Sequence, residues 1–247
     1  MTELLLHLDQ PLAPDLDPAA LDGLTGLVVD VGCFAPMHCL ALCAPVVALC
    51  GTSPGDRPDW DDKLTPLRVV DQGLEVCARL RDAHPERAWL PRLIVDRQAV
   101  SYRMSNYRGE GFKFFTPDSA SIQGYRVTDG DRPLAAALKR AQELGFARLW
   151  LHARDAAQQG KGLDLDLLER AQRDFPEKLW ISGGATEPRH LENLTREGGA
   201  TGLVIGTELL ARTDIATLLT ALTPLRAPET LPETPVQVKL DAAAVTG

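Results

Sequence analysis

The sequence predicts an α/β fold, a (β/α)8 or TIM barrel with a closed parallel sheet and a Pro-rich carboxy-terminal tail. About seven or eight short apolar runs of strand length alternate with stretches whose apolar residues have helical spacing. Near the carboxyl end, glycine turns follow two consecutive strands, which is the arrangement after strands seven and eight of a phosphate-binding barrel. No G-x-G-x-x-G motif follows a strand, which argues against an open dinucleotide-binding sheet.

In the first half of the chain, apolar runs predict strands and amphipathic stretches predict helices. Helices are expected over residues 17–24, 35–44 and 67–83, and the last of these has Val70, Leu74, Cys77 and Leu80 at helical spacing. The polar stretch from Arg97 to Glu110 is expected to be a lid or an insertion, and residues 121–127 to belong to the same excursion. The predicted strands are Leu4–Leu8, Leu27–Val31, Val46–Cys50, Leu90–Val95 and Gly111–Phe115.

In the second half, the alternation of strand and helix is more regular. Asp131 and Pro133 are expected to cap a helix that runs to Leu144, and Asp214 to cap a last helix over residues 215–222. Between them we expect a strand over residues 146–152, a polar loop over 153–161 and a helix over 163–175. Residues 1–225 are predicted to form one barrel domain, and residues 226–247 a loosely attached tail.

Composition limits the classes of partner. The chain has 247 residues, 45% of them hydrophobic and 24% charged, which is typical of a globular domain. A net charge of -8 argues against a nucleic-acid partner, because such binding needs a basic face. No apolar run reaches membrane-spanning length, and the first residues lack the basic region of a signal peptide. We therefore expect a cytoplasmic protein with no membrane partner, and the sequence leaves the oligomeric state open.

The five cysteines do not predict a disulfide framework or a metal site. No C-x-x-C pair and no H-x-x-x-H pair is present. His38 lies among three of the cysteines and could be a ligand with them, but buried free thiols are the favoured interpretation. No metal and no organic cofactor is therefore expected. The cysteines are Cys33, Cys39, Cys43, Cys50 and Cys77.

The segment from Lys178 to Leu210 predicts an anion site. It contains a strand ending in S-G-G, a helix that Thr186 would cap, and a second strand ending in I-G-T. Turns without a Cβ let backbone N–H groups approach a phosphate, although each turn alone could serve only the fold. The expected phosphate-binding residues are Ser182, Gly183, Gly184, Ala185, Ile205, Gly206 and Thr207.

The same segment, SGGATEPRHLENLTREGGATGLVIGTELL, resembles the HisA/HisF family, the phosphoribosyl isomerase and cyclase barrels of histidine biosynthesis. GYRVTDGDRPLAAALKRAQELGFARLWLH and GKGLDLDLLERA, further upstream, are similar to that family as well. The resemblance implies a barrel with two catalytic aspartates, one ending strand one and one ending strand five. Asp9 matches the first position, whereas RLWLH, interpreted as strand five, offers His152 or Ala153 at the second.

Polar residues at strand ends are the candidates for catalysis, because barrel enzymes place their chemistry there. Asp9, Asp30 and His152 could move protons, and Lys113 could form a Schiff base with a carbonyl substrate. Each of them could equally be structural or solvated. Arg103 and Arg108 could close over a phosphate or carboxylate, or could simply be solvated.

Together these patterns predict an isomerase or lyase that acts on a small phosphorylated metabolite by acid/base chemistry. The triple glycine that the family carries after strand three is absent, so the histidine-pathway step itself is not expected. Family relatives with diverged halves occur in gene sets for one-carbon carriers such as tetrahydromethanopterin, and the resemblance extends that expectation to this chain. The alternative is a catalytically inactive barrel that serves as a subunit or ligand-binding protein, which the apparent loss of the strand-five aspartate favours.

Overall fold

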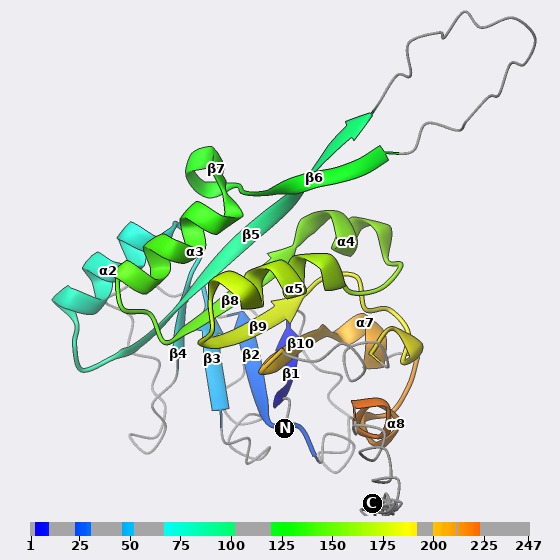
Figure 1. Ribbon diagram of the computed structural model, residues 1–247. Coiled ribbons are helices and arrows are strands. Elements are labelled where there is room, and N and C mark those ends of the chain that lie inside the picture. Colours follow the sequence, from blue (N-terminus) through cyan, green and yellow to red (C-terminus); the bar gives the residue numbers. More distant parts are fainter. Residues whose placement is uncertain are drawn as a thin grey trace, which may run out of the picture.

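The chain forms a closed barrel of eight parallel strands, as the sequence predicted (Figure 1). A computed structural model describes residues 3–9, 23–30, 46–51, 67–101, 120–191, 200–210 and 212–222. Each barrel strand pairs in parallel with its two neighbours. The pairings of β1 with β10 and of β4 with β5 complete the circle. The barrel strands are β1 (Glu3–Leu8), β2 (Gly26–Asp30), β3 (Val46–Cys50), β4 (Leu67–Val70), β5 (Ala88–Ser101), β8 (Arg148–Ala153), β9 (Lys178–Ser182) and β10 (Gly202–Gly206).

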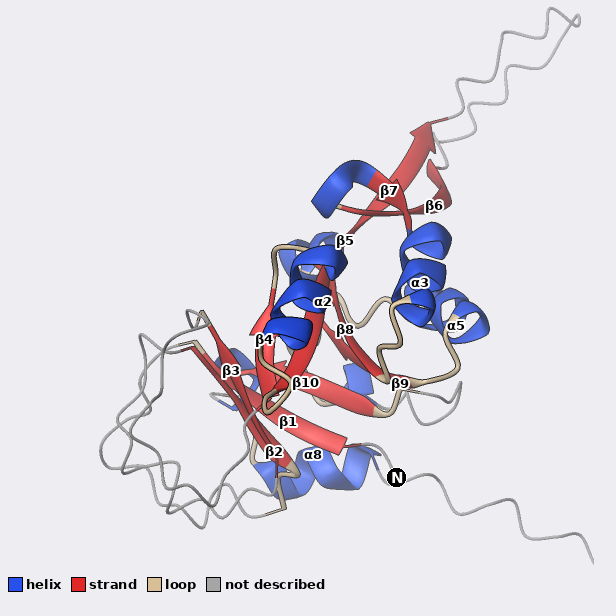
Figure 2. Cartoon of the chain, turned by 90° about the vertical axis from the view of Figure 1, so that its left-hand side faces the viewer, coloured by secondary structure: helices blue, strands red, loops and turns tan. Residues whose placement is uncertain are grey.

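Helices lie outside the barrel. Figure 2 shows α2, α3 and α5 together on one side, and α8 beside β1 and β2. Asp214 accepts a hydrogen bond from the backbone N–H of Thr217 at 2.7 Å, which confirms the predicted cap of the last helix. The helices are α2 (Leu74–Ala83), α3 (Leu134–Glu143), α4 (Arg154–Gln159), α5 (Leu165–Asp174), α7 (Thr207–Leu210) and α8 (Ile215–Leu222).

Several predictions of local structure are wrong. The helix expected over residues 67–83 is a strand, β4, followed by the shorter helix α2, which begins after Gly73 at a φ of 98°. The polar loop expected over residues 153–161 contains the helix α4, although it is only 6 residues long. Pro133 is at the N-cap position of α3 as predicted, whereas Asp131 lies two residues before it and its carboxylate accepts a hydrogen bond from Arg126 at 2.6 Å.

Finding β4 changes the strand count, and the change bears on function. With β4 included, β5 is the fifth barrel strand and β8 is the sixth. The sequence RLWLH was interpreted above as strand five. It belongs to β8 and therefore to strand six. The residue just beyond the barrel part of strand five is Asp96, which follows the last pairing of β5 with β8, between Val95 and Ala153.

The fifth strand continues beyond the barrel into an antiparallel arm. Its 14 residues pair first with β4 and β8, and then with β6 (Ala120–Val127), which the short strand β7 (Arg132–Pro133) follows. Figure 1 shows this arm extending away from the barrel. The expected excursion is thus confirmed for residues 121–127, whereas Gly111–Phe115 and most of the expected lid lie outside the described residues.

A buried network fixes the base of the arm to helix α5. The carboxylate of Asp164, which is only 2% exposed, accepts hydrogen bonds from the Tyr125 hydroxyl at 2.8 Å and from Arg97 Nε at 2.6 Å. Asp164 also caps α5 by accepting from the backbone N–H of Leu167 at 3.1 Å. The backbone N–H of Arg97 donates to Asp155 at 2.6 Å, so Arg97 and Asp155 are structural residues of this junction.

The barrel interior is filled by two tryptophans. Trp150 and Trp180 are at most 1% exposed, and a Cβ at Gly202 would lie 2.2 Å from the Trp180 ring. Gly202 therefore makes room for the indole, as large and small residues alternate in packed barrels. The apolar residues of this interior cluster are Leu5, Val28, Ala48, Cys50, Val69, Leu90, Trp150, Trp180 and Val204.

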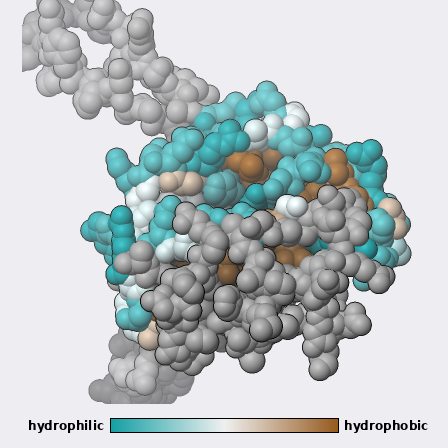
Figure 3. Space-filling view, turned by 180° about the vertical axis from the view of Figure 1, so that it is seen from behind, coloured by the Kyte–Doolittle hydropathy of each residue, from teal (hydrophilic) through white to brown (hydrophobic). Residues whose placement is uncertain are grey.

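Hydrophilic residues cover most of the described surface seen from behind, with smaller apolar patches between them (Figure 3). Among the described helices, none has the length and apolar character that crossing a membrane would require. The Pro-rich tail from residue 226 lies outside the described residues, so the division into domain and tail stays a prediction.

Candidate functional site

A ring of polar side chains lies at the carboxyl ends of the barrel strands. Side chains alternate along a strand, so the residue two positions after an interior apolar residue also points inward, one layer nearer the mouth. His7 follows Leu5 in this way, and His152 follows Trp150. Polar residues, not apolar plugs, therefore occupy this layer of the barrel. The layer comprises His7, Asp30, Cys50, Arg92, His152 and Ser182, with Gly206 ending β10.

His152 and Ser182 form the side of this ring nearest the first glycine turn. The Nδ1 atom of His152 lies 2.9 Å from the Ser182 hydroxyl oxygen, and Trp150 Nε1 donates to the same oxygen at 2.8 Å. Because indole only donates, Ser182 keeps its own proton, which it can donate to Nδ1 of a neutral imidazole. In that tautomer Nε2 carries the ring proton.

Burial keeps the His152 imidazole neutral. Desolvation, reinforced by the positive charge of Arg92, lowers the pKa of His152 to about 4. A neutral imidazole can donate a hydrogen bond and also take up a proton as charge develops on a substrate. The structure thus places His152 at the mouth, where the sequence predicted it.

His7, Asp30 and Cys50 lie together on three successive strands. His7 Nε2 is 3.2 Å from a carboxylate oxygen of Asp30, and the Cys50 thiol lies within 4.8 Å of both ligand atoms. Asp30 and Cys50 are register partners in the parallel pairing of β2 with β3. Burial, above all, raises the pKa of the Cys50 thiol above its usual range. Asp30 is thus at the mouth as predicted, with two partners that the sequence did not suggest.

Arg92 and Asp71 form a bidentate ion pair next to this group. The guanidinium donates from Nε and from one terminal nitrogen to the two carboxylate oxygens, each at 2.6 Å. It also lies 4.7 Å from the centre of the Trp150 ring, a cation–π distance. The ion pair brings a positive charge into the mouth and largely neutralises it there.

Asp9 lies beside the second glycine turn. Its carboxylate accepts a hydrogen bond from the Thr207 hydroxyl at 3.3 Å, and the neighbouring His7 is the register partner of Gly206. The expected catalytic aspartate and the expected phosphate turn therefore meet at the junction of β1 and β10.

The two glycine turns differ in why they need glycine. Gly183 and Gly184 have φ values of 104° and 93°, and their missing Cβ positions are 2.4 Å from the Ala153 carbonyl oxygen and 2.1 Å from that of Gly162. Close packing of backbone therefore accounts for both residues. At Gly206 a Cβ would meet no atom of the described residues within 4 Å, so these residues leave the space beside it open.

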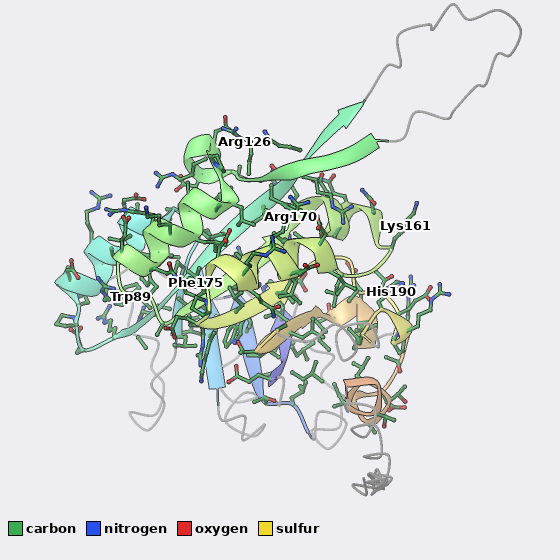
Figure 4. All side chains as sticks on the ribbon, viewed as in Figure 1. Trp89, Arg126, Lys161, Arg170, Phe175 and His190 are labelled. Carbon is green, nitrogen blue, oxygen red and sulfur yellow. The ribbon has the colours of Figure 1, made fainter. Side chains whose placement is uncertain are left out.

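The loop after β9 is tied to the loop after α4. Gly184 accepts a hydrogen bond from the backbone N–H of Gly162 at 2.8 Å, and the Thr186 hydroxyl donates to the Gly160 carbonyl, also at 2.8 Å. Thr186 does not cap the next helix as predicted, because helical residues begin only at Arg189. The Thr186 N–H donates instead to His190 Nδ1 at 3.2 Å, and Figure 4 shows His190 on the same side of the molecule as Lys161.

Asp96 lies at the end of the fifth barrel strand, opposite β1 in the order around the barrel. One carboxylate oxygen is buried and accepts no hydrogen bond from the described residues, although Arg154 Nε lies 3.4 Å away as an ion-pair partner. The other oxygen accepts a weak hydrogen bond from Thr128 at 3.4 Å. An aspartate therefore stands at the end of the barrel part of strand five, where the sequence interpretation had found none.

Sequence reasoning did not select several residues of this ring. Asp71 and Arg92 belong to no motif, and His7 and Cys50 look like isolated core residues in the chain. The pattern that could have identified them is the alternation along a strand: each lies two residues after an apolar interior residue, so its side chain also points inward. Lys113, Arg103 and Arg108 lie outside the described residues, so their expected roles stay predictions.

Comparison with models of known protein families gives no match, and a search of curated proteins finds no relative either.

Proposed function

We propose that this barrel is an enzyme that acts on a small phosphorylated metabolite by proton transfer next to a carbonyl or imine. The observation that carries this proposal is the ring of polar side chains at the carboxyl ends of the strands. Purely structural barrels have no need to keep imidazole, carboxylate and guanidinium groups together there, since apolar residues would pack better.

Asp9 and Asp96 are the proposed acid and base. They end the first and fifth strands, which are opposite each other around an eight-stranded barrel, so a small substrate between them would be reached from both sides. These are also the strand positions of the two aspartates that the HisA/HisF resemblance implies. Asp96 carries a buried oxygen to which no described residue donates a hydrogen bond, and this suits a group that must exchange a proton with a substrate.

His152 is the proposed third member of the set. Its neutral ring is held by Ser182, and the proposed orientation leaves Nε2 to donate to a developing alkoxide or enolate oxygen. Such a neutral electrophile avoids the cost of placing another positive charge beside Arg92.

The substrate's phosphate is proposed to lie at the ends of β9 and β10. Support comes from the space beside Gly206, which the described residues leave open, and from the hydroxyl of the next residue, Thr207, which donates to Asp9. Gly183 and Gly184 shape the turn after β9, which Ala185 follows, and Ile205 is the residue of β10 directly before Gly206. The link to biosynthesis of a one-carbon carrier such as tetrahydromethanopterin rests on the family resemblance alone.

The proposal is tested by incubating the chain in deuterated water with sugar phosphates and amino-sugar phosphates, and following exchange and isomerisation by NMR. Asp9→Asn and Asp96→Asn are each expected to lower the rate by about 10²-fold or more, the usual contribution of a general acid or base. Asp82→Asn, at a carboxylate 73% exposed on α2, is the matched control and should keep the rate. Absence of exchange with every compound, or equal rates in all variants, would refute the proposal.

A further inference from the structure

We propose that His7, Asp30 and Cys50 form a binding site for one divalent transition-metal ion, with Zn²⁺ the best match. The three residues come from β1, β2 and β3 and meet at the mouth of the barrel. The site is independent of the proposed acid/base function, because it would hold its ion whether or not a phosphorylated substrate binds.

The spacing of the ligand atoms fits tetrahedral coordination. Metal–nitrogen and metal–oxygen bonds of about 2.1 Å place two ligand atoms about 3.4 Å apart around a tetrahedral ion. His7 Nε2 and the Asp30 oxygen are 3.2 Å apart, and all three ligand atoms lie within 4.8 Å of one another. Small rotations of the Cys50 and Asp30 side chains therefore suffice to bring all three onto one ion.

The chemistry of the three ligands selects the kind of ion. A thiolate, an imidazole and a carboxylate together suit Zn²⁺ and its neighbours, whereas Mg²⁺ and Ca²⁺ prefer oxygen ligands throughout. A thiolate and a carboxylate also bring two negative charges, which balance a divalent cation. Arg92 is the competing positive charge at this site, and its bidentate pair with Asp71 offsets it.

Among the described residues, three ligands are supplied and the fourth side of the site faces the mouth. Cys50 is 3% exposed and anchors the inner side, whereas the Asp30 side chain is 38% exposed and faces the mouth. The His7 ring is held in place by an edge-to-face contact with Trp150, at 5.7 Å between ring centres. Three protein ligands with an open fourth position are typical of zinc sites that bind water or a substrate oxygen.

Cobalt substitution tests the site directly. The full-length chain is stripped with a chelator, dialysed and titrated with Co²⁺, and the absorption spectrum is recorded. We expect one equivalent to bind, with the intense visible bands of tetrahedral Co²⁺ and a thiolate-to-cobalt charge-transfer band, and Zn²⁺ to displace it. Absence of stoichiometric binding, or a spectrum without the charge-transfer band, would overturn the proposal.

Cysteine variants locate the site. Cys50→Ser should abolish the charge-transfer band, and His7→Gln or Asp30→Asn should weaken binding by more than about 100-fold, beyond the loss typical of an outer-shell change. Cys77→Ser, at a buried thiol on α2 outside the barrel interior, is the matched control and should keep the band. Circular dichroism of each variant shows whether it remains folded.

A triple variant, Cys33→Ser with Cys39→Ser and Cys43→Ser, separates this site from the other cysteines of the chain. The proposal predicts that the triple variant keeps the band and the stoichiometry. Loss of the band in the triple variant, with retention in Cys50→Ser, would assign the metal elsewhere and overturn the proposal. Asp30→Asn changes a side chain that faces solvent, so it provides a second test of the metal site if Cys50→Ser fails to fold.

Discussion

The Nδ1 atom of His152 lies 2.9 Å from the hydroxyl oxygen of Ser182, and this contact joins the sixth barrel strand to the residue before the first glycine turn. It fixes an imidazole in a largely buried position, where the pKa of His152 falls to about 4, chiefly through desolvation. The contact therefore links the proposed chemistry to a measurable dependence of stability on pH.

His152 should make the protein less stable as the pH falls. Its pKa drops from 6.5 to about 4 on folding, so between these values the unfolded chain binds a proton that the folded chain does not. The free energy of unfolding then decreases with falling pH across this window, by at most ~1.4 kcal/mol per pH unit, and the loss is complete below about pH 4. Urea denaturation of the protein and of His152→Gln between pH 4 and 7 measures the effect. Equal slopes in the two proteins would show that His152 is not the group responsible.

Alanine should destabilise the protein strongly at the first glycine turn and only slightly, if at all, at the second. Gly183→Ala places a Cβ 2.4 Å from the Ala153 carbonyl oxygen at a φ of 104°, so we expect a loss of more than ~2 kcal/mol of stability. At Gly206 the added Cβ meets no atom of the described part of the chain within 4 Å, and the φ of this residue is not left-handed, so Gly206→Ala should change the stability by less than ~1 kcal/mol. Thermal and urea denaturation of the pair test this contrast, and equal losses would contradict the described packing.

Tyr125→Phe should loosen the base of the arm. The substitution removes the hydroxyl that donates to Asp164 at 2.8 Å and contacts Asp166 at 3.0 Å. Hydrogen bonds to charged groups contribute about 1.5–3 kcal/mol, so a stability loss in that range is expected. Hydrogen exchange should show faster exchange of backbone amides in β6 and at the start of α5. A variant with unchanged stability and exchange would mean that this network does not hold the arm.

The ion pair between Asp71 and Arg92 should show measurable coupling. Asp71→Asn leaves the guanidinium partly buried against Trp150 without its carboxylate, and Arg92→Met removes the positive charge as well. Because the pair is bidentate and only partly exposed, we expect a coupling energy of about 1 kcal/mol or more in a double-mutant cycle of stability. Strict additivity of the two substitutions would argue against the pair.

Much of the fold could be predicted from the sequence because its signals are local. The alternation of apolar runs and helical spacing, and the two terminal glycine turns, identify a parallel barrel without long-range information. The failure at β4 was also local. Leu67–Val70 continues directly into the apolar spacing of α2, and only Gly73, with its left-handed φ, marks the boundary.

The site could be predicted only in part, because it depends on which residues of different strands share a layer. Asp9, Asp30 and His152 were recognisable as polar residues at strand ends. His7 and Cys50 are 43 positions apart and gain significance only through the register of three strands. Asp96 was overlooked as the strand-five aspartate because the missed β4 shifted the count by one strand.

The most direct test of the account is a thermal-shift titration with inorganic phosphate and a panel of sugar phosphates and amino-sugar phosphates. A ligand at a hundred times its dissociation constant should stabilise the protein by about 2.7 kcal/mol. The account predicts such a shift for at least one phosphorylated compound, its loss in Gly206→Asp, and its retention in the control Asp82→Asn, which lies on α2 away from the mouth. No shift with any phosphorylated compound, or equal shifts in Gly206→Asp and the unchanged protein, would contradict a phosphate site at this mouth.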